Sequence, residues 1–227
     1  MNFFKPYSMQ KYLVFIIFLL TCCIVSICSS AQENRKNAWL VELNKIEKQV
    51  DSFVANPLYP DDPFILATLK EAIKASHEEN GGIGACLVSE VTGEIVELGH
   101  NRQFEPYYRS DLHAEMDLLT RYEERVKAVR RGGRGSPSTP ETRKMAGLVL
   151  YTSVEPCPMC LTRIINTGIK KVFYAVEDET GGMVQKMSEL PLFWQNLAAN
   201  NEYKAADCSP ELRDIARHLF RPAHYKR

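Results

Sequence analysis

The residues most suited to chemistry lie in two short segments, His113-Ala114-Glu115 and Pro156-Cys157-Pro158-Met159-Cys160. One imidazole and two thiols are typical zinc ligands, and a tetrahedral zinc with three protein ligands keeps its fourth position open for water or substrate. The pattern therefore predicts a catalytic Zn²⁺ held by His113, Cys157 and Cys160. Glu115 is the remaining ionisable group, and we expect it to take a proton from water at the zinc and pass it to the substrate.

Simpler interpretations exist for the same residues. A Cys-x-x-Cys pair in an oxidising compartment can close a disulfide, and a zinc site without a reaction would make the chain an exported non-catalytic zinc-binding protein. The presence of Glu115 beside the ligand histidine argues against this second alternative. Backbone N–H groups at Ala114 and Cys157 are candidates for stabilising developing charge, so Ala114 is included among the expected substrate-binding residues.

Two helix beginnings are expected to position the predicted ligands. A turn-rich segment precedes His113, which together with Glu115 then lies in the first turn of a helix. The strand Leu148–Ser153 ends just before Cys157, and Pro158 suits the first turn of the helix that follows. A helix N-terminus lowers the pKa of thiols placed there and so favours thiolate ligands.

The remaining elements predict an α/β arrangement. Periodicity and turn residues indicate helices over 37–53, 64–79, 190–197 and 210–220, and strands over 83–88, 95–98 and 172–176. The first two of these strands form a hairpin, whereas the order strand, helix, strand around the cysteines implies a parallel crossover. The sheet is therefore expected to be mixed.

Taken together, the His-Ala-Glu and Pro-Cys-Pro-Met-Cys segments resemble the signature of the cytidine deaminase-like zinc deaminases. The resemblance covers about residues 63–179 and implies a three-layer α-β-α fold with a mixed central sheet, extended by helices at both ends. The cysteine motif and Gly99-His100-Asn101-Arg102 are most similar to the branch that holds guanine deaminases, fungal-type cytosine deaminases and tRNA adenosine deaminases. In that branch the asparagine before the zinc helix contacts the substrate, which implies this role for Asn101.

The resemblance also implies a reaction and its partners. We expect a hydrolytic deaminase that releases ammonia from a nucleobase or nucleoside, with Zn²⁺ as cofactor and guanine as the first choice of base. The alternative is a deaminase of nucleic acid, similar to the tRNA adenosine deaminases. Aromatic candidates for a base-stacking pocket are Tyr107, Tyr108, Phe193 and Trp194, with core or interface packing as the other interpretation. A homodimer is also considered.

The N-terminus predicts export. Lys5 and Lys11 precede an apolar run over 12–28 that ends in Ser29-Ser30-Ala31, as in a secretory signal peptide cleaved after Ala31. An uncleaved membrane anchor is the alternative. The expected parts are thus a signal peptide over 1–31, a helical extension over 32–60, and a deaminase domain over 61–227 with a helical tail from about residue 188. The mature protein would be periplasmic or secreted.

Charge disfavours a nucleic-acid substrate. The 28 lysines and arginines equal the 28 acidic residues, and two of the lysines lie in residues 1–31, which leaves 26 basic residues in the mature chain. Nucleic-acid enzymes usually present a basic surface to the phosphates. The segment Arg130–Pro137 is basic, but no aromatic residues are interleaved for base stacking, so a solvated loop is expected there in preference to a phosphate-binding patch.

Overall fold

The computed structural model describes residues 7–132 and 145–220, with side chains over 30–127 and 145–220. By its internal contacts the chain divides into a unit that ends at Asn44 and a unit that begins at Lys45. Helix α1 (Tyr7–Ser52) is longer than the helix predicted over 37–53, because it includes the apolar run and passes Ala31 without a break. Over residues 30–127 and 145–220, whose side chains the structure describes, no helix combines the length and apolar character needed to cross a membrane.

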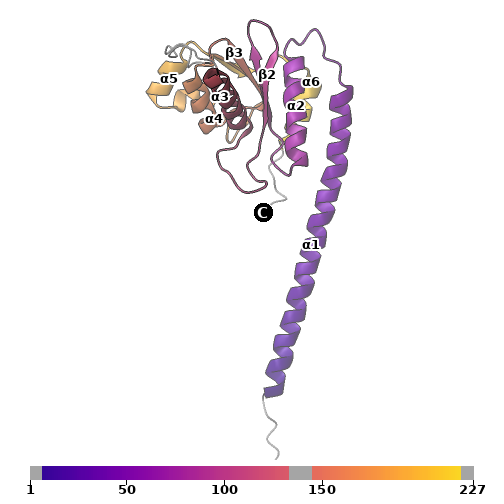
Figure 1. Ribbon diagram of the computed structural model, residues 1–227. Coiled ribbons are helices and arrows are strands. Elements are labelled where there is room, and N and C mark those ends of the chain that lie inside the picture. Colours follow the sequence, from indigo (N-terminus) through magenta and orange to yellow (C-terminus); the bar gives the residue numbers. More distant parts are fainter. Residues whose placement is uncertain (1–6, 133–144, 221–227) are drawn as a thin grey trace, which may run out of the picture. The chain divides into compact units, whose positions relative to one another are not determined.

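Five strands form one mixed sheet in the second unit (Figure 1). They are β1 (Gly84–Ser89), β2 (Ile95–His100), β3 (Leu148–Val154), β4 (Lys171–Val176) and β5 (Glu202–Ala205), in the spatial order β2-β1-β3-β4-β5. Strand β1 pairs antiparallel with β2 and β3, and β4 pairs parallel with β3 and β5. The predicted hairpin, parallel crossover and mixed sheet are confirmed.

Helices cover both faces of this sheet (Figure 1). On one face lie α2 (Asp62–His77) and α6 (Pro210–Leu219), which contact each other and the central strands. On the other face lie α3 (Ala114–Gly132) and α4 (Pro158–Thr167), with α5 (Leu192–Ala198) packed on α4. The arrangement is the predicted three-layer α-β-α fold.

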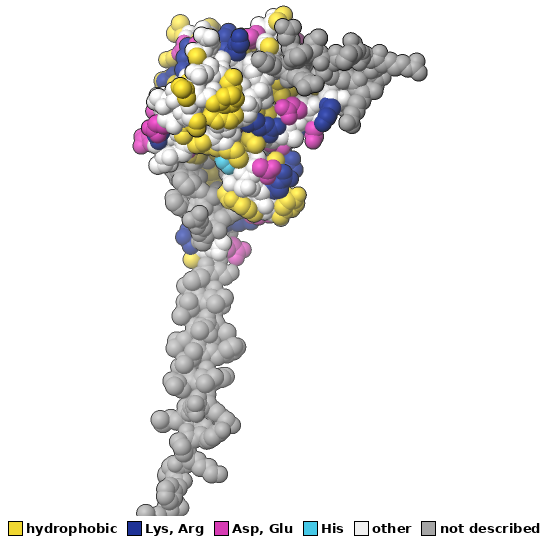
Figure 2. Space-filling view, turned by 90° about the vertical axis from the view of Figure 1, so that its left-hand side faces the viewer, with side chains coloured by type: hydrophobic (Ala, Val, Ile, Leu, Met, Phe, Trp, Pro, Cys, Tyr) yellow, Lys and Arg dark blue, Asp and Glu magenta, His cyan; other side chains and the backbone are white. Residues whose placement is uncertain are grey.

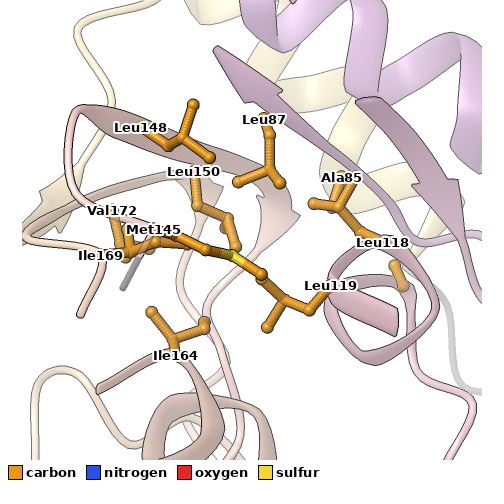
Figure 3. Close-up of a cluster of buried hydrophobic side chains, with 11 residues drawn as sticks. Ala85, Leu87, Leu118, Leu119, Met145, Leu148, Leu150, Ile164, Ile169 and Val172 are labelled. Carbon is orange, nitrogen blue, oxygen red and sulfur yellow. The ribbon is translucent and has the colours of Figure 1, made fainter. Parts of the chain in front are cut away.

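A buried apolar cluster joins α3 and α4 to the sheet (Figure 3). Its members come from β1, β3, β4, the two helices and the segments beside them: Ala85, Leu87, Ala114, Leu118, Leu119, Met145, Leu148, Leu150, Ile164, Ile169 and Val172. Full burial of a leucine side chain stabilises a fold by about 1.5–3 kcal/mol. The cluster therefore holds both helices in a fixed relation to the sheet.

The C-terminal part differs from its prediction because it is not purely helical. A short 3₁₀ helix, η2 (Met187–Glu189), precedes α5, and strand β5 follows it. The sequence of β5, Glu-Tyr-Lys-Ala, is short and polar and has no strand pattern of its own. It is a strand because it pairs with β4, where Tyr203 lies opposite Val172. Helix α6 begins after Ser209 as predicted, and the Ser209 backbone N–H donates to Asp62 of α2 at 2.6 Å.

Candidate active site

The predicted site residues gather at one edge of the sheet. Gly84 at the start of β1 lies opposite His100 at the end of β2, and Val154 at the end of β3 lies opposite Val176 at the end of β4. Strands β2, β3 and β4 thus end at the edge where β1 begins. The carboxyl ends of strands in α/β sheets are a common place for ligands to bind.

Two helix N-termini bring the predicted ligands to this edge. The carbonyl oxygen of His113 accepts a hydrogen bond from the Asp117 N–H at 2.9 Å, so His113 lies just before helix α3 and not within its first turn as predicted. Cys157 occupies the same position before α4, Pro158 is the first residue of that helix, and Cys160 lies in its first turn. The proline was predicted correctly.

The three ligand atoms have the spacing of a tetrahedral zinc site. The Nδ1 atom of His113 lies 3.6 Å from the Sγ atom of Cys157 and 3.7 Å from that of Cys160. Bonds of about 2.0–2.1 Å to nitrogen and 2.3 Å to sulfur at a tetrahedral angle require a separation of about 3.6 Å. Both cysteines are free thiols, and the three donor atoms lie within 4.8 Å of one another. The donor set fits Zn²⁺, and no disulfide joins Cys157 to Cys160.

Glu115 is buried beside these ligands, with only 4% of its surface exposed. Burial, followed by the negative charge of Cys157, raises the pKa of Glu115 to about 7. A carboxyl group with such a pKa can accept and release a proton near neutral pH. The hydrogen bond from the Cys160 thiol, assisted by the His113 ring, lowers the pKa of Cys157 to about 4, which favours its thiolate as a ligand.

A cavity of about 250 Å³ opens onto this group. Its walls come from the segments beside the ends of β2, β3 and β4, the start of β1 and the end of α6. The lining residues are Gly81, Gly82, Ile83, Asn101, Gln103, Phe104, His113, Glu115, Val154, Glu155, Cys157, Asp178 and Phe220. Of the predicted residues, Asn101, His113, Glu115 and Cys157 line the cavity. Ala114 and Cys160 are fully buried and do not.

The side chain of Asn101 has a defined orientation. Its Oδ1 atom accepts a hydrogen bond from the backbone N–H of Gln103 at 3.0 Å, and its own backbone N–H donates to Ile83 at 2.9 Å. A backbone N–H can only donate, so the amide oxygen must face Gln103. The amide nitrogen is then the group that can donate to a substrate.

Several lining residues were not singled out from the sequence. Glu155 and Asp178 follow strands β3 and β4, and their place after predicted strands is the signal that could have found them. Phe104 belongs to the irregular segment after β2, where no pattern distinguishes it from its neighbours. Phe220 comes from the end of α6, and no local signal connects it to the site.

Glu155 holds one wall of the cavity in place. Only 4% of its surface is exposed. Its carboxylate accepts hydrogen bonds from the backbone N–H groups of Asp178 at 3.1 Å and Gln185 at 2.8 Å. A side chain at Gly182 would overlap the Glu155 carboxyl group, so glycine is needed for this close approach. Glu155 therefore fixes the 177–185 loop, which carries Asp178 to the cavity.

The four aromatic candidates for base stacking do not line the cavity. Tyr107, Tyr108 and Phe193 are exposed, whereas Trp194 packs against the cluster around Leu161. Hydrophobic side chains gather on the face that carries α5 (Figure 2). The packing or surface interpretation is thus favoured for all four.

The basic segment predicted as a solvated loop begins within helix α3 and continues outside the described residues. Arg130 and Arg131 belong to the backbone of α3, but their side chains and all of residues 133–137 lie outside the described part of the chain.

Comparison with known proteins identifies the family. The family model for the cytidine and deoxycytidylate deaminase zinc-binding region matches residues 60–176. The chain belongs to this deaminase family. The recognised superfamily and the Zn²⁺ cofactor are thereby confirmed, since the matched region contains the His113, Cys157 and Cys160 group.

Individual relatives of this deaminase family member are tRNA-specific adenosine deaminases. The enzyme of Bacillus subtilis is 34% identical over 122 residues, which are 54% of this chain and 65% of that enzyme. The enzyme of Aquifex aeolicus is 30% identical over 150 residues, 66% of this chain and 88% of that enzyme. The chain thus spans slightly less than two thirds of the Bacillus relative.

Solved structures confirm the fold. One, from a study of A-to-I editing by tRNA deaminases at the wobble position, has a TM-score of 0.50 and 22% identity and covers 69% of this chain and 98% of its own. Another, a mutant of the protein NE0047 in complex with 8-azaguanine, has a TM-score of 0.52 and 20% identity and covers 75% of this chain and 87% of its own.

Proposed function

We propose that this family member is a zinc-dependent hydrolytic deaminase of a free nucleobase or nucleoside. The observation that carries the substrate class is the charge of the cavity. Carboxylates of Glu115, Glu155 and Asp178 line it, and among the described residues no lysine or arginine does. Phosphate groups select cationic partners, whereas an uncharged base with N–H groups finds acceptors here.

Guanine is our first choice of base. Asn101 offers a donor for a carbonyl oxygen or ring nitrogen, and Glu155 and Asp178 offer acceptors for N–H groups. Apart from its reacting amino group, guanine has the acceptors O6 and N7, which suit the Asn101 donor. It also has a ring N–H, which suits a carboxylate acceptor. Adenosine has no N–H group on its base other than the amino group that is lost, so it would leave the carboxylates without a partner.

The mechanism assigns the proton transfers to Glu115. His113, Cys157 and Cys160 would hold the zinc ion, which when bound supplies a Lewis acid that lowers the pKa of water. Glu115 takes the proton as the water oxygen adds to the amino-bearing carbon, and delivers it to the adjacent ring nitrogen. Glu115 then takes the second proton of that oxygen and transfers it to the departing amino group, so that a C=O bond forms as the C–N bond breaks and ammonia leaves.

We further propose that the protein is exported through residues 1–31. Export supports the small substrate, since a deaminase outside the cytoplasm is separated from the tRNA pool and meets the products of nucleic-acid breakdown. The proposed substrate class does not require export, because the charge of the cavity is the same wherever the protein is located.

The second candidate function is deamination of adenosine in tRNA. It is favoured by the relatives of 34% and 30% identity, which are named tRNA-specific adenosine deaminases. A polymer substrate would insert one base into the cavity and contact the protein outside it.

A substrate panel separates the two functions. Ammonia release from guanine, cytosine, adenine and their nucleosides is compared with deamination of a tRNA anticodon stem-loop and single-stranded DNA, at two salt concentrations. The Glu115→Gln protein, purified in parallel, measures any contaminating deaminase. Turnover of guanine or its nucleoside with little salt dependence is expected. Efficient, salt-sensitive turnover of a polymer would replace our proposal by the second candidate, and a zinc-loaded protein inactive on the whole panel would favour a non-catalytic zinc-binding protein.

A further inference from the structure

A buried histidine outside the cavity is held between two carboxylates. His100 is the last residue of β2 and is only 3% exposed. Its Nδ1 atom lies 2.8 Å from Glu71 Oε2, and its Nε2 atom lies 2.9 Å from Glu78 Oε2. An ionised carboxylate only accepts hydrogen bonds, so each ring nitrogen must carry a hydrogen. The geometry therefore holds His100 as a positively charged imidazolium.

The balance of charge around the ring agrees with this state. Burial would lower the pKa of His100, but the hydrogen bonds that its ring donates to Glu71 and Glu78 outweigh burial and raise the pKa above the usual 6.5. Other charged or titratable groups around the site come from α2, the turn after it, the segment after β2 and α3: Lys74, His77, Glu79, Arg102, Glu105 and Arg121. Lys74 and Arg121 also lower the pKa of Glu71, after the larger effect of His100 itself.

The same helix and its following turn hold the segment after His100. The Oδ1 atom of Asn80 accepts hydrogen bonds from the backbone N–H groups of Phe104 at 2.8 Å and Glu105 at 3.0 Å, and Asn80 is 2% exposed. The segment is thus fixed at both ends, by His100 and by Asn80. Between these anchors, Asn101 and Gln103 line the cavity, as does Phe104 itself.

We propose that His100 is a positioning residue, which ties the end of β2 to α2 and so holds the Asn101 amide in place for the substrate. Neither His100 nor its two carboxylate partners line the cavity, so the effect must pass through the backbone to Asn101. The catalytic part of this proposal rests on the proposed function. The structural part, which couples the charge of His100 to the Asn101 side chain, does not.

The first test reads that coupling without any activity. In the zinc-loaded full chain, labelled with ¹⁵N, NMR follows the His100 ring and the Asn101 side-chain amide as pH is raised. We expect His100 to titrate above 6.5 and the Asn101 amide signal to shift with the same midpoint. Glu78→Gln should lower that midpoint, and Glu90→Gln, which removes the partner of Lys171 at the other end of β1, should leave it unchanged. A midpoint at or below 6.5, or an Asn101 signal that does not follow it, would overturn the proposal.

The second test is a double-mutant cycle in deamination. His100→Gln, and separately Glu78→Gln in case the first variant folds poorly, should lower kcat/KM about tenfold with zinc content unchanged. In an Asn101→Ala background the same changes should cost less than about twofold, because the group they position is absent. Equal losses in both backgrounds would mean that His100 serves general stability and not Asn101. If no substrate is turned over, the proposed function fails, and the NMR result still decides the coupling.

Discussion

The Nδ1 atom of His113 lies 3.6 Å from the Sγ atom of Cys157, although the residues are 44 positions apart in the chain. The contact exists because two helices begin at the same edge of one sheet and are held there by a shared apolar cluster. It joins two motifs that are each uninformative alone into one metal site. The predictions below test that site, its proton carrier and its walls.

Removal of both thiols should abolish zinc binding. A Cys157→Ser Cys160→Ser variant leaves one of three ligands, which cannot hold the ion in tetrahedral geometry. Metal analysis of the purified protein should find one zinc per chain in the parent and none in the variant. Cys208→Ser, which changes a buried free cysteine outside the site, should retain the zinc. A double variant that keeps its zinc would show that other residues hold the metal.

Glu115→Gln should keep the zinc and the fold while losing turnover by about 10²–10⁴-fold, because the variant lacks the group that moves the proton. Steady-state kinetics and metal analysis on the same preparation give both quantities. The matched control is Glu123→Gln, on the exposed part of the same helix, which should change the rate by less than about twofold. Comparable activity in Glu115→Gln would assign the proton transfer to another group.

Asn101 allows two of its functions to be separated. Asn101→Ala should lower kcat/KM by about tenfold to a hundredfold, since a polar group of the substrate loses a partner worth about 1–3 kcal/mol. Asn101→Asp keeps the acceptor for the Gln103 N–H but loses the donor toward the substrate. It should therefore be as impaired as the alanine variant. Near-normal activity of the aspartate variant would mean that Asn101 serves only the turn.

Glu155→Gln should loosen the loop over residues 177–185. Glutamine has one acceptor oxygen in place of two, so one of the N–H groups of Asp178 and Gln185 would face an amide donor. The expected cost is about 1–3 kcal/mol in the free energy of unfolding. Urea denaturation measures it, and limited proteolysis should cut the loop faster than in the parent. A stability equal to that of the parent would show that the two hydrogen bonds contribute nothing.

The His100 cluster predicts a pH window for stability. Folding raises the pKa of His100, so its contribution is complete below the unfolded value of about 6.5 and is lost as pH rises through the folded value. Folding lowers the pKa of Glu71, chiefly through the hydrogen bond to His100, so its contribution is lost as pH falls from about 4.5 through the folded value. The stability difference between the parent and His100→Gln should therefore be greatest between about pH 4.5 and 6.5. Urea titrations across this range check it, and a difference that grows above pH 8 would have the wrong sign.

Local patterns in the chain were sufficient for the elements and the metal ligands. Gly168 illustrates this, because its left-handed conformation, with φ of 80°, ends α4 in the way a glycine commonly ends a helix. The metal ligands could be predicted from residue types and from the positions where helices begin, and both depend on neighbours only a few positions away. The types of His113, Cys157 and Cys160 could therefore be interpreted without knowledge of the rest of the fold.

The cavity and its supports were decided by the tertiary structure alone. Glu155 and Asp178 are two acidic residues among 28 in the sequence, and only the meeting of strand ends at one sheet edge makes them walls of the site. Phe220 reaches the cavity because α6 packs on α2, more than a hundred residues earlier in the chain. The charge of His100 likewise depends on two carboxylates on another element. The sequence by itself determined the element types and the ligand chemistry, since these follow from local spacing; which distant side chains share one cavity depends on packing between layers, which no local pattern encodes.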